Sequence, residues 1–416
     1  MNYSFGKSTT LAALDIGSSK VCCLIARFSR DRKFNIVGYG YNASKGIKNG
    51  VIVDLNLATK SVCDAVESAE QMANERIERL IVNVNSDKIK SLIKNSAIAL
   101  NKNKPVSDVD TKKVIDKGIN KVNFEGMELV HCMSTQYRLD SQETIKNPIN
   151  IYGETLSVDI LLGMVPYIVF RNINTVLEHS HLEMASSAFS PYASALACIT
   201  EEEKEYGATV VDIGGGTTSI AIFKGGFPTY FASIPVGGVN ITNDIAYGLT
   251  TSFAHAERLK TLHGCAFLTM EDKNEILNIY PVGQEDDSSI KQVAKEELIN
   301  IIASRVEEIF EIVNKHLEAN GLKDISSHRV ILTGGTSQLS GISEVAQLIL
   351  DKQIRLGVPK NVFSLPEMLK TPEFASCVGL LSFAVSYSEK KPIKAAPKIS
   401  ATGGLSGIFN WLKKNI

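Results

Sequence analysis

The chain has 416 residues and a formal net charge of −1; 44% of its residues are hydrophobic and 21% are charged. This length exceeds what one hydrophobic core serves, so two or more domains are expected, and the near-neutral charge gives no general attraction to nucleic acid. No signal peptide or transmembrane helix is expected, because the apolar runs at 11–14 and 158–170 are too short. The seven cysteines include no C-x-x-C pair, which predicts reduced thiols in a cytoplasmic protein.

Two related segments predict an internal duplication of one α/β unit. Residues 9–28 and 208–227 each hold an apolar run, Asp-Ile-Gly, small hydroxyl residues and a second apolar run, a pattern typical of strand, tight turn and strand. In each half a further strand, a glycine turn and a helix follow, and the first helix is expected at 55–74. A strand then closes each unit, at 79–86 and at 329–336. Self-similarity on this scale is the signature of a duplicated fold.

Two insertions interrupt this plan. Residues 87–165 alternate apolar and polar positions around a helical stretch at 109–122, which predicts a small inserted α+β subdomain. Residues 238–300 are rich in helical patterns, and a long amphipathic helix is expected at 290–319.

The two Asp-Ile-Gly turns are candidate phosphate loops. In DIGSSK (15–20) a glycine after the strand lets the backbone approach an anion closely, and Ser18, Ser19 and Lys20 can bind phosphate oxygens. DIGGGTTS (212–219) repeats the arrangement with more glycine. One such loop equally fits an ordinary hairpin turn, but two related loops, one in each half, favour phosphate binding.

The carboxylates Asp15 and Asp212 are expected to face each other across the gap between these loops. Two carboxylates beside a polyphosphate suit Mg²⁺, held mostly through its water molecules. A third glycine element, VILTGGTSQLSGI (330–342), runs from a strand into a helix. Gly334 and Gly335 there would let a base or ribose pack on bare backbone, although a simple strand-to-helix turn with a Ser/Thr N-cap also fits.

Two common nucleotide-binding motifs do not match. Neither loop reads GxxxxGK[ST], and neither opens a helix as GxGxxG does. A P-loop NTPase and a dinucleotide-binding Rossmann site are therefore disfavoured.

The three glycine elements, in this order, resemble the actin/Hsp70/sugar-kinase superfamily over residues 9 to about 386, and PYASALA (191–197) is similar to its connecting helix. More local stretches, DIGSSKV, VVDIGGGTTSIAIFKGG and AERLKTLHGCA, resemble the FtsA family of bacterial cell-division proteins. The resemblance implies an α/β, duplicated actin-like (ribonuclease H-like) two-domain ATPase fold. An inserted α+β subdomain (1C) and a C-terminal amphipathic helix are also implied.

The resemblance divides the chain into four subdomains and a tail. The implied ranges are 1–86 and 166–204 for 1A, 87–165 for 1C, 205–237 and 301–387 for 2A, 238–300 for 2B, 388–402 for a flexible basic linker and 403–416 for a membrane-targeting helix.

The resemblance also implies which residues bind ATP and Mg²⁺. The nucleotide-binding set is Asp15, Gly17, Ser18, Ser19, Lys20, Asp212, Gly214, Gly215, Gly216, Thr217, Thr218, Glu257, Lys260, Gly334, Gly335 and Thr336, with Asp15 and Asp212 on the metal side. Glu257 and Lys260 are expected to close over the adenosine, although as an i,i+3 pair they also fit a solvated helix face. In ASRVEEIF (303–310), Arg305 is the expected contact of the C-terminal tail of the tubulin-like division protein FtsZ, or else a surface arginine beside Glu308.

Catalytic turnover is not expected from the residues before the connecting helix. Active actin-like hydrolases place Glu or Gln there, whereas this chain has Ala188, Phe189, Ser190 and Pro191. ATP binding with weak or absent hydrolysis is therefore preferred. A sugar or acetate kinase and a pilus-assembly ATP-binding scaffold of the same superfamily stay open as alternatives. A chaperone is disfavoured, because no substrate-binding β domain follows.

The chain ends in a basic, proline-containing linker and the segment GIFNWLKKNI. On a helix this end forms an apolar stripe with Trp411, the only tryptophan, at its border and basic residues beside it. The residues expected to contact a membrane are Leu405, Ile408, Phe409, Trp411, Leu412, Lys413, Lys414 and Ile416. A terminal helix docked on the body of the protein is the alternative.

Taken with the resemblance, these features imply an ATP-binding, actin-like peripheral membrane protein. It is expected to polymerise, to tether the FtsZ ring to the cytoplasmic face of the cell membrane at the division septum and to recruit later division proteins, with no nucleic acid as partner.

Overall fold

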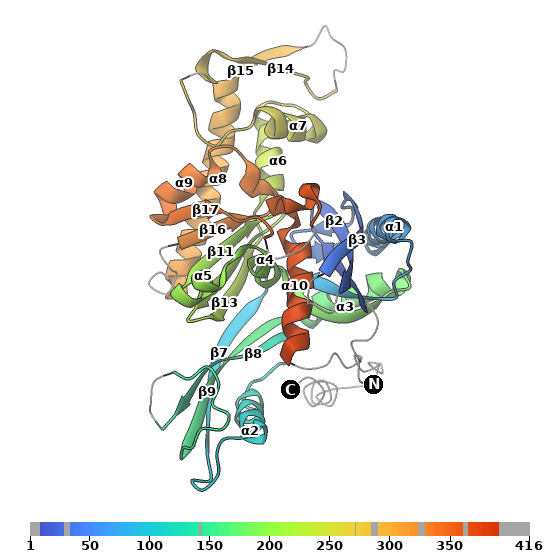
Figure 1. Ribbon diagram of the computed structural model, residues 1–416. Coiled ribbons are helices and arrows are strands. Elements are labelled where there is room, and N and C mark those ends of the chain that lie inside the picture. The colour runs from blue at the N-terminus through green and yellow to red at the C-terminus, as the bar shows by residue number, and fades with distance from the viewer. Residues whose placement is uncertain are drawn as a thin grey trace.

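Two five-stranded sheets with the same strand order form the frame of the molecule (Figure 1). The computed structural model describes residues 9–28, 34–140, 144–270, 272–283, 290–322, 329–360 and 365–390. The first sheet contains β1 (Thr9–Ile16), β2 (Lys20–Phe28), β3 (Phe34–Ala43), β6 (Arg79–Val84) and β10 (Glu183–Phe189), in the order β3-β2-β1-β6-β10. The second contains β11 (Ala208–Ile213), β12 (Thr218–Lys224), β13 (Phe227–Ile234), β16 (Arg329–Thr333) and β17 (Gln353–Leu356), in the order β13-β12-β11-β16-β17.

The pairing directions of the two sheets are also the same. In each sheet the first three strands along the chain are antiparallel, and the next two add in parallel. The register repeats as well, since Asp15 lies opposite Cys22 and Asp212 lies opposite Ser219. The predicted duplication and the actin-like α/β fold class are confirmed.

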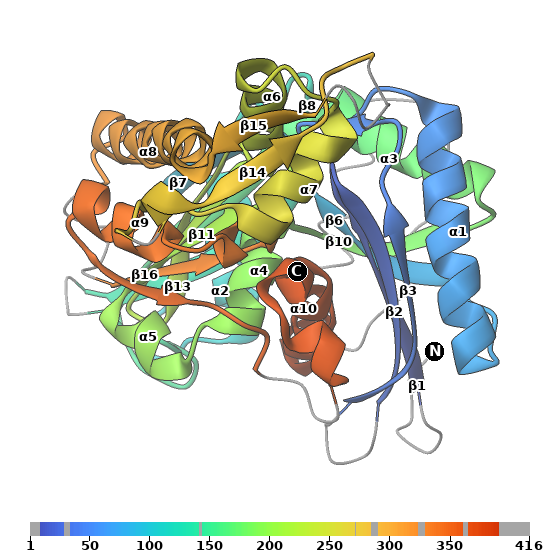
Figure 2. The same ribbon diagram turned by 90° about the horizontal axis from the view of Figure 1, so that it is seen from above.

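The sheets and helices stack in layers (Figure 2). Helices α1 (Leu55–Ala73) and α3 (Tyr167–His179) cover the outer face of the first sheet, and α8 (Lys295–Ala319) and α9 (Ile342–Leu350) cover that of the second. Helices α4 (Ser190–Cys198) and α10 (Ala375–Lys390) lie between the sheets.

Helix α1 shows how the local sequence fixes these layers. Asp54 caps its N-terminus, with its Oδ1 accepting from the Leu57 backbone N–H at 2.9 Å, and Asn74 ends it in the left-handed conformation at φ 51°. A β-carbon on Gly40 of β3 would lie 2.2 Å from the Ala65 carbonyl oxygen. The helix therefore reaches the sheet only because glycine faces alanine at this point.

The two central helices also pack at unusually close range. A β-carbon on Gly379 of α10 would lie 1.7 Å from the Ala193 carbonyl oxygen of α4, so no larger residue fits there without a shift. The sequence division placed 375–387 in subdomain 2A. The buried residues of α10, including Cys377 and Leu381, pack with α4 and with β1 and β2 of the first sheet.

The inserted block forms a separate α+β unit at the base of Figure 1. Strands β7 (Lys90–Ala99), β9 (Thr155–Pro166) and β8 (Met127–Leu139) form an antiparallel sheet in that order, and α2 (Asp108–Ile119) packs on it around a separate core. This confirms the predicted inserted α+β subdomain.

The opposite end of the molecule carries the second insertion. It consists of α6 (Gly238–Gly248), α7 (Phe253–His263) and the hairpin β14 (Ile276–Ile279) with β15 (Lys291–Ala294) (Figure 1). The long helix predicted from 290 begins at Lys295 instead, because the preceding four residues pair with β14.

The smaller elements are β4 (Ile47–Lys48), β5 (Val51–Ile52), α5 (Glu201–Tyr206) and the 3₁₀ turns η1 (Asp272–Asn274), η3 (Gly335–Gln338), η4 (Glu367–Lys370) and η5 (Pro372–Phe374). Within the described residues, none of the helices is both long enough and apolar enough to cross a bilayer. The expected membrane-contact residues from Leu405 to Ile416, and the linker beyond Lys390, lie outside the described residues.

Candidate functional site

The two predicted phosphate loops have the same backbone turn at corresponding ends of β1 and β11. The Gly17 N–H donates to the Lys20 carbonyl oxygen at 3.0 Å, and the Gly214 N–H donates to the Thr217 carbonyl oxygen at 2.9 Å. Each turn follows one residue after the aspartate and returns the chain into the neighbouring antiparallel strand. The duplication therefore places two equivalent turns in the two halves.

The structure brings these loops into contact across the two halves. A β-carbon on Gly215 would lie 2.7 Å from Cβ of Ser19, and one on Gly216 would lie 2.7 Å from Oγ of Ser18. Ser18 Oγ also accepts from the Gly50 backbone N–H at 2.9 Å, which fixes this side of the first loop. The loops approach this closely because the second one presents bare backbone.

The backbone of the second loop is oriented by the start of α6. The Gly214 carbonyl oxygen accepts from the Gly238 N–H at 2.9 Å, and the Gly215 carbonyl oxygen accepts from the Val239 N–H at 2.7 Å. In a planar trans peptide the N–H points opposite to the preceding C=O. The N–H groups of Gly215 and Gly216 therefore point away from α6, and successive N–H groups of this kind suit an anion.

Asp15 and Asp212 are the second-last residues of the equivalent strands β1 and β11, and the charge of Asp212 acts on Asp15. The pKa of Asp15 is raised to about 6, because burial and the nearby charge of Asp212 outweigh the lowering effects of Lys20 and of the hydrogen bond from Ser376. Burial likewise raises the pKa of Asp212 to about 6, against the lowering effect of a hydrogen bond from Ser194. A cation bound beside these two carboxylates would stabilise their charged forms and so lower their raised pKa values.

The residues present fit Mg²⁺ held largely by water. Mg²⁺ is commonly bound by one or two carboxylates together with waters and phosphate oxygens. Asp15 and Asp212 supply two carboxylates, and no cluster of three or more His, Cys, Asp or Glu side chains suited to a metal occurs in the part of the chain that the structure describes. The donor set thus suits a hydrated ion shared with a polyphosphate.

Two serines that sequence reasoning missed support the aspartates from the central helices. Ser194 Oγ of α4 donates to Asp212 Oδ2 at 2.5 Å, and Ser376 Oγ of α10 donates to Asp15 Oδ1 at 3.2 Å. Helix α4, at the end of the first repeat, therefore supports the carboxylate of the second repeat. Helix α10, at the end of the second repeat, supports the carboxylate of the first. A weak sequence signal links them, because an aromatic residue, alanine and serine follow one another at both places, Tyr-Ala-Ser (192–194) and Phe-Ala-Ser (374–376), although they fall at different positions relative to the helix starts.

The third glycine element lies against the second phosphate loop. A β-carbon on Gly334, where φ is +86°, would lie 2.3 Å from Asp212 Oδ1. Thr336 Oγ1 donates to the Gly214 carbonyl oxygen at 3.0 Å, and Gly335 lies near Glu373. Glycine at 334 is required both by the left-handed backbone and by the contact.

Glu257 and Lys260 join this region through the start of α6. Lys260 Nζ donates to Glu257 Oε2 at 2.7 Å, to Thr242 Oγ1 at 2.7 Å and to the Gly238 carbonyl oxygen at 3.1 Å. Thr242 Oγ1 also donates to Glu257 Oε2 at 2.5 Å. The pair links α7 to the helix whose first turn holds the second phosphate loop, so it is more than a solvated i,i+3 pair.

Lys20 makes an ion pair and a cation–π contact that the sequence did not predict. Its Nζ lies 3.1 Å from Glu373 Oε2 and 3.4 Å from the centroid of the Phe374 ring. These two residues form part of η5, directly before α10. The predicted phosphate contact of Lys20 therefore competes with an internal ion pair.

The two threonines of the second loop have different hydrogen-bond partners. Thr217 Oγ1 accepts from Asn85 Nδ2 at 2.9 Å, which joins the loop to the end of β6 in the other half. Thr218, predicted as a phosphate contact, is fully buried and its Oγ1 donates to the Val236 carbonyl oxygen at 2.8 Å. Its side chain is thus engaged within the second half.

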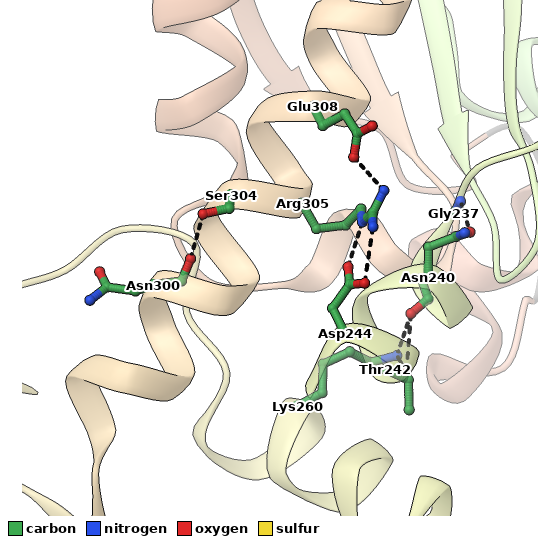
Figure 3. A network of polar contacts seen from close by, with 10 residues as sticks. Gly237, Asn240, Thr242, Asp244, Lys260, Asn300, Ser304, Arg305 and Glu308 are labelled. Atoms are coloured by element: carbon green, nitrogen blue, oxygen red, sulfur yellow. Dashed lines mark hydrogen bonds and ion pairs between the residues drawn. The ribbon is translucent and has the colours of Figure 1, made fainter. Parts of the chain in front are cut away.

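Arg305 lies apart from the loops, on α8 (Figure 3). Its Nε donates to Asp244 Oδ2 at 2.5 Å and its Nη2 to Asp244 Oδ1 at 2.9 Å, and its Nη1 pairs with Glu308. Figure 3 shows Arg305 and Asp244 pointing toward each other from α8 and α6, with Asn300 and Ser304 earlier along α8. The guanidinium is therefore held in a bidentate pair with α6.

An open pocket of about 600 Å³ adjoins this part of α8. It is lined by Gly248, Ala294, Glu296, Glu297, Asn300, Ile301 and Ser304. The lining combines carboxylates, an amide and an aliphatic side chain.

Comparison with known proteins gives matches over nearly the whole chain. The model of the family "Cell division protein FtsA" matches residues 209–379, and that of the "SHS2 domain inserted in FTSA" matches residues 86–162. Cell division protein FtsA of Agrobacterium fabrum is 33% identical over 423 residues, covering 98% of this chain and 95% of the relative. The FtsA protein of Escherichia coli strain K12 is 28% identical and covers 97% of each chain.

Solved structures with the same fold are far less similar in sequence. The PilM-PilN type IV pilus biogenesis complex matches with a TM-score of 0.63 at 15% identity, covering 90% of this chain and 98% of that one. MreB5 of Spiroplasma citri bound to ADP matches with a TM-score of 0.55 at 13% identity, covering 93% and 99%. These likenesses show the actin-like fold alone, whereas the similarity over nearly the full length of the FtsA relatives shows that the chain belongs to the FtsA family of cell-division proteins.

Proposed function

We propose that this protein binds ATP with Mg²⁺, polymerises as an actin-like filament, and tethers the FtsZ ring to the cytoplasmic membrane at the division septum, where it recruits later division proteins. The observation that carries the nucleotide part is the contact of two equivalent loops from the two halves. Gly215 and Gly216 lie against Ser19 and Ser18, and the carboxylates of Asp15 and Asp212 lie beside them. A polyphosphate between the loops would join the two halves through one ligand.

The nucleotide would lie along the path of the three glycine elements. The N–H groups of Gly215 and Gly216, together with Ser18, would hold phosphate oxygens, and Mg²⁺ would neutralise charge beside Asp15 and Asp212. Gly334 and Gly335 offer backbone for the adenosine. The MreB5 structures in complex with ADP and with AMPPNP are consistent with a nucleotide in this fold.

Hydrolysis is proposed to be weak or absent. The end of β10 and the start of α4, where active relatives place an acid or amide, contain Ala188, Phe189 and Ser190. Ala188 and Phe189 are fully buried, and Ser190 Oγ accepts from Asn83 Nδ2 at 3.0 Å. None of these groups is a strong base for a water molecule.

The C-terminal tail of FtsZ is proposed to dock on α6 and α8. Arg305 of α8 pairs with Asp244 of α6, and the open pocket is lined by Gly248 of α6 and by residues of α8 that include Asn300 and Ser304. An acidic group of the tail would compete with Asp244 for the guanidinium of Arg305. A charge reversal, Arg305→Glu, is therefore expected to weaken FtsZ binding without changing nucleotide binding.

The tail at 403–416 is proposed as the membrane contact. Five apolar side chains at roughly 1.5–3 kcal/mol each set an upper limit of about 7–15 kcal/mol, and partial immersion and helix ordering reduce it sharply. Nearby lysines add about 1 kcal/mol each on an anionic leaflet. One copy would bind reversibly, and a filament would bind firmly through many copies.

A sedimentation assay with the full-length chain tests these proposals together. ATP, anionic vesicles and FtsZ are each left out in turn, and Trp411→Glu serves as the tail variant. We expect the wild-type chain to pellet with vesicles, to carry FtsZ with it and to form larger assemblies with ATP. Trp411→Glu is expected to stay in the supernatant while still binding ATP.

Separate outcomes would contradict separate parts. A Trp411→Glu variant that still pellets with vesicles would exclude the membrane role of the tail. Equal FtsZ recovery with Arg305→Glu would exclude the docking site on α8. Turnover of ATP that depends on a hexose or acetate would show a small-molecule kinase instead.

A further inference from the structure

The contacts of Lys20 with η5 lead to an inference about how the first phosphate loop is controlled. Lys20 Nζ lies 3.1 Å from both the side-chain Oε2 and the backbone carbonyl oxygen of Glu373, and it stacks over the ring of Phe374. The side chain of Lys20 is 17% exposed and that of Glu373 is 40% exposed. A phosphate group that takes Lys20 must therefore displace a partly buried carboxylate or share the ammonium with it.

The same short segment also reaches Asp15 and the third glycine element. Ser376 Oγ donates to Asp15 Oδ1 at 3.2 Å, and the Pro372 carbonyl oxygen accepts from the Gly334 N–H at 3.2 Å. Residues 372–376 thus touch the metal-side carboxylate, the phosphate-side lysine and the adenosine-side glycine. Within this segment Phe374 packs in the core that α10 also enters, whereas the side chain of Glu373 faces Lys20.

We propose that residues 372–376 position the first phosphate loop, with opposite effects of their two polar side chains. Glu373 competes with phosphate for Lys20, which weakens binding of phosphorylated ligands. Ser376 fixes the orientation of Asp15, which strengthens the part of binding that depends on Mg²⁺. This inference rests on the proposed nucleotide binding and names two positioning residues of that site.

The Glu373 part is tested by Glu373→Gln in the full-length chain. Binding of ATP, ADP and adenosine is measured by titration calorimetry, each with and without Mg²⁺. Glu373→Gln should bind ATP and ADP about 3-fold more tightly, the scale expected for losing a partly exposed ion pair, and adenosine should be unaffected. Glu367→Gln is the matched control, since Glu367 pairs with Lys370 in η4.

The Ser376 part is tested by Ser376→Ala and Ser376→Thr. Ser376→Ala is expected to lower ATP affinity about 5-fold with Mg²⁺ present and to leave affinity in EDTA unchanged, because only the carboxylate orientation is lost. Ser376→Thr keeps the hydroxyl and should restore most of the binding. Ser382→Ala on the same helix controls for the loss of a serine, since its Oγ donates within α10, to the Val378 carbonyl oxygen.

The readouts separate this inference from the proposed function. A wild-type chain that binds no ATP would overturn the proposed function itself. The proposed role of Glu373 is contradicted if the wild-type chain binds ATP but Glu373→Gln leaves its ATP affinity unchanged. It is also contradicted if Glu373→Gln strengthens adenosine binding as much as ATP binding. A Ser376→Ala variant that loses affinity equally in Mg²⁺ and EDTA would show a structural effect and overturn the positioning role. A lower melting temperature for this variant, with an unchanged ratio of the two affinities, would do the same.

Discussion

The two phosphate loops share one backbone turn, yet they would bind an anion by different means. The first, at 15–20, presents side chains, and its lysine and aspartate are each held by residues of the 372–376 segment. The second, at 212–219, presents backbone, and the first turn of α6 fixes its carbonyl groups. The two repeats therefore share the backbone turn but differ in the groups they offer to an anion. The first loop offers side chains that neighbouring residues can reorient, and the second offers backbone groups that α6 holds in place.

This difference predicts unequal responses to substitution. A side-chain loop responds to changes of charge in its partners, whereas a backbone loop responds to added volume. Binding measured on matched variants of the two loops can confirm or break this comparison.

The largest effect is expected from Gly215→Ala in the second loop. The new β-carbon would lie 2.7 Å from Cβ of Ser19, so the two halves must separate. Overpacking of this kind costs about 1–3 kcal/mol, and we expect ATP affinity to fall about 100-fold. Gly214→Ala is the control within the loop, because its nearest neighbour is 3.4 Å away. Equal losses for the two variants in a calorimetric titration would contradict the close contact.

An intermediate effect is expected from Asp15→Asn and Asp212→Asn. Each removes one carboxylate from the metal side, and we expect ATP affinity with Mg²⁺ to fall about 10-fold while affinity in EDTA changes little. A larger loss of ATP affinity for Asp212→Asn than for Asp15→Asn would support the difference between the two loops. Asp212 lies against both Ser194 and Gly334, so it has less freedom to adjust.

The same two variants are expected to stabilise the fold in a pH-dependent way. The pKa of each carboxyl is raised by burial from 3.8 to about 6, so the folded state favours the neutral form. The resulting penalty is present in full above pH 6 and disappears as the pH falls toward 4. Discounted for partial solvent access, it is about 1–2 kcal/mol at pH 8 for each group.

Urea denaturation at pH 8 and pH 4 measures this difference. Both asparagine variants should unfold at higher urea concentration than the wild type at pH 8, and the advantage should nearly vanish at pH 4. Variants that are less stable than the wild type at pH 8 would show that the carboxylates are structural rather than strained.

The smallest effect is expected from Asn85→Ala. Its Nδ2 donates to Thr217 Oγ1 at 2.9 Å and so joins the first half to the second loop. Loss of one such hydrogen bond costs about 0.5–1.5 kcal/mol, and we expect ATP affinity to fall about 3- to 5-fold. Asn95→Ala in the inserted subdomain, where Asn95 donates to Asp159, provides the control. No change for Asn85→Ala would show that this contact is not used when nucleotide binds.

Much of this architecture was readable in the sequence because it repeats. The shared Asp-Ile-Gly turns predicted the two sheets, and the strand order confirmed them. Alternating patterns predicted the inserted subdomain. The helix predicted from 290 began later, at Lys295, because apolar periodicity does not distinguish a short strand from the first turn of a helix.

The contacts that complete the site depended on tertiary placement. The contacts of Ser376 and Glu373 with the first loop join residues more than 350 positions apart, so neither was expected there from the sequence. Arg305 was predicted as a partner contact, but its bidentate pair with Asp244 joins residues 61 positions apart. Long-range pairs of this kind leave no periodic signal.

Titration calorimetry of the full-length chain with ATP, in Mg²⁺ and in EDTA, tests the central claim most directly. The two loops together are predicted to bind one ATP per chain, more tightly with Mg²⁺, and Gly215→Ala is predicted to abolish most of that affinity while Gly214→Ala keeps it. An absence of saturable binding, or binding that Gly215→Ala leaves unchanged, would contradict the account.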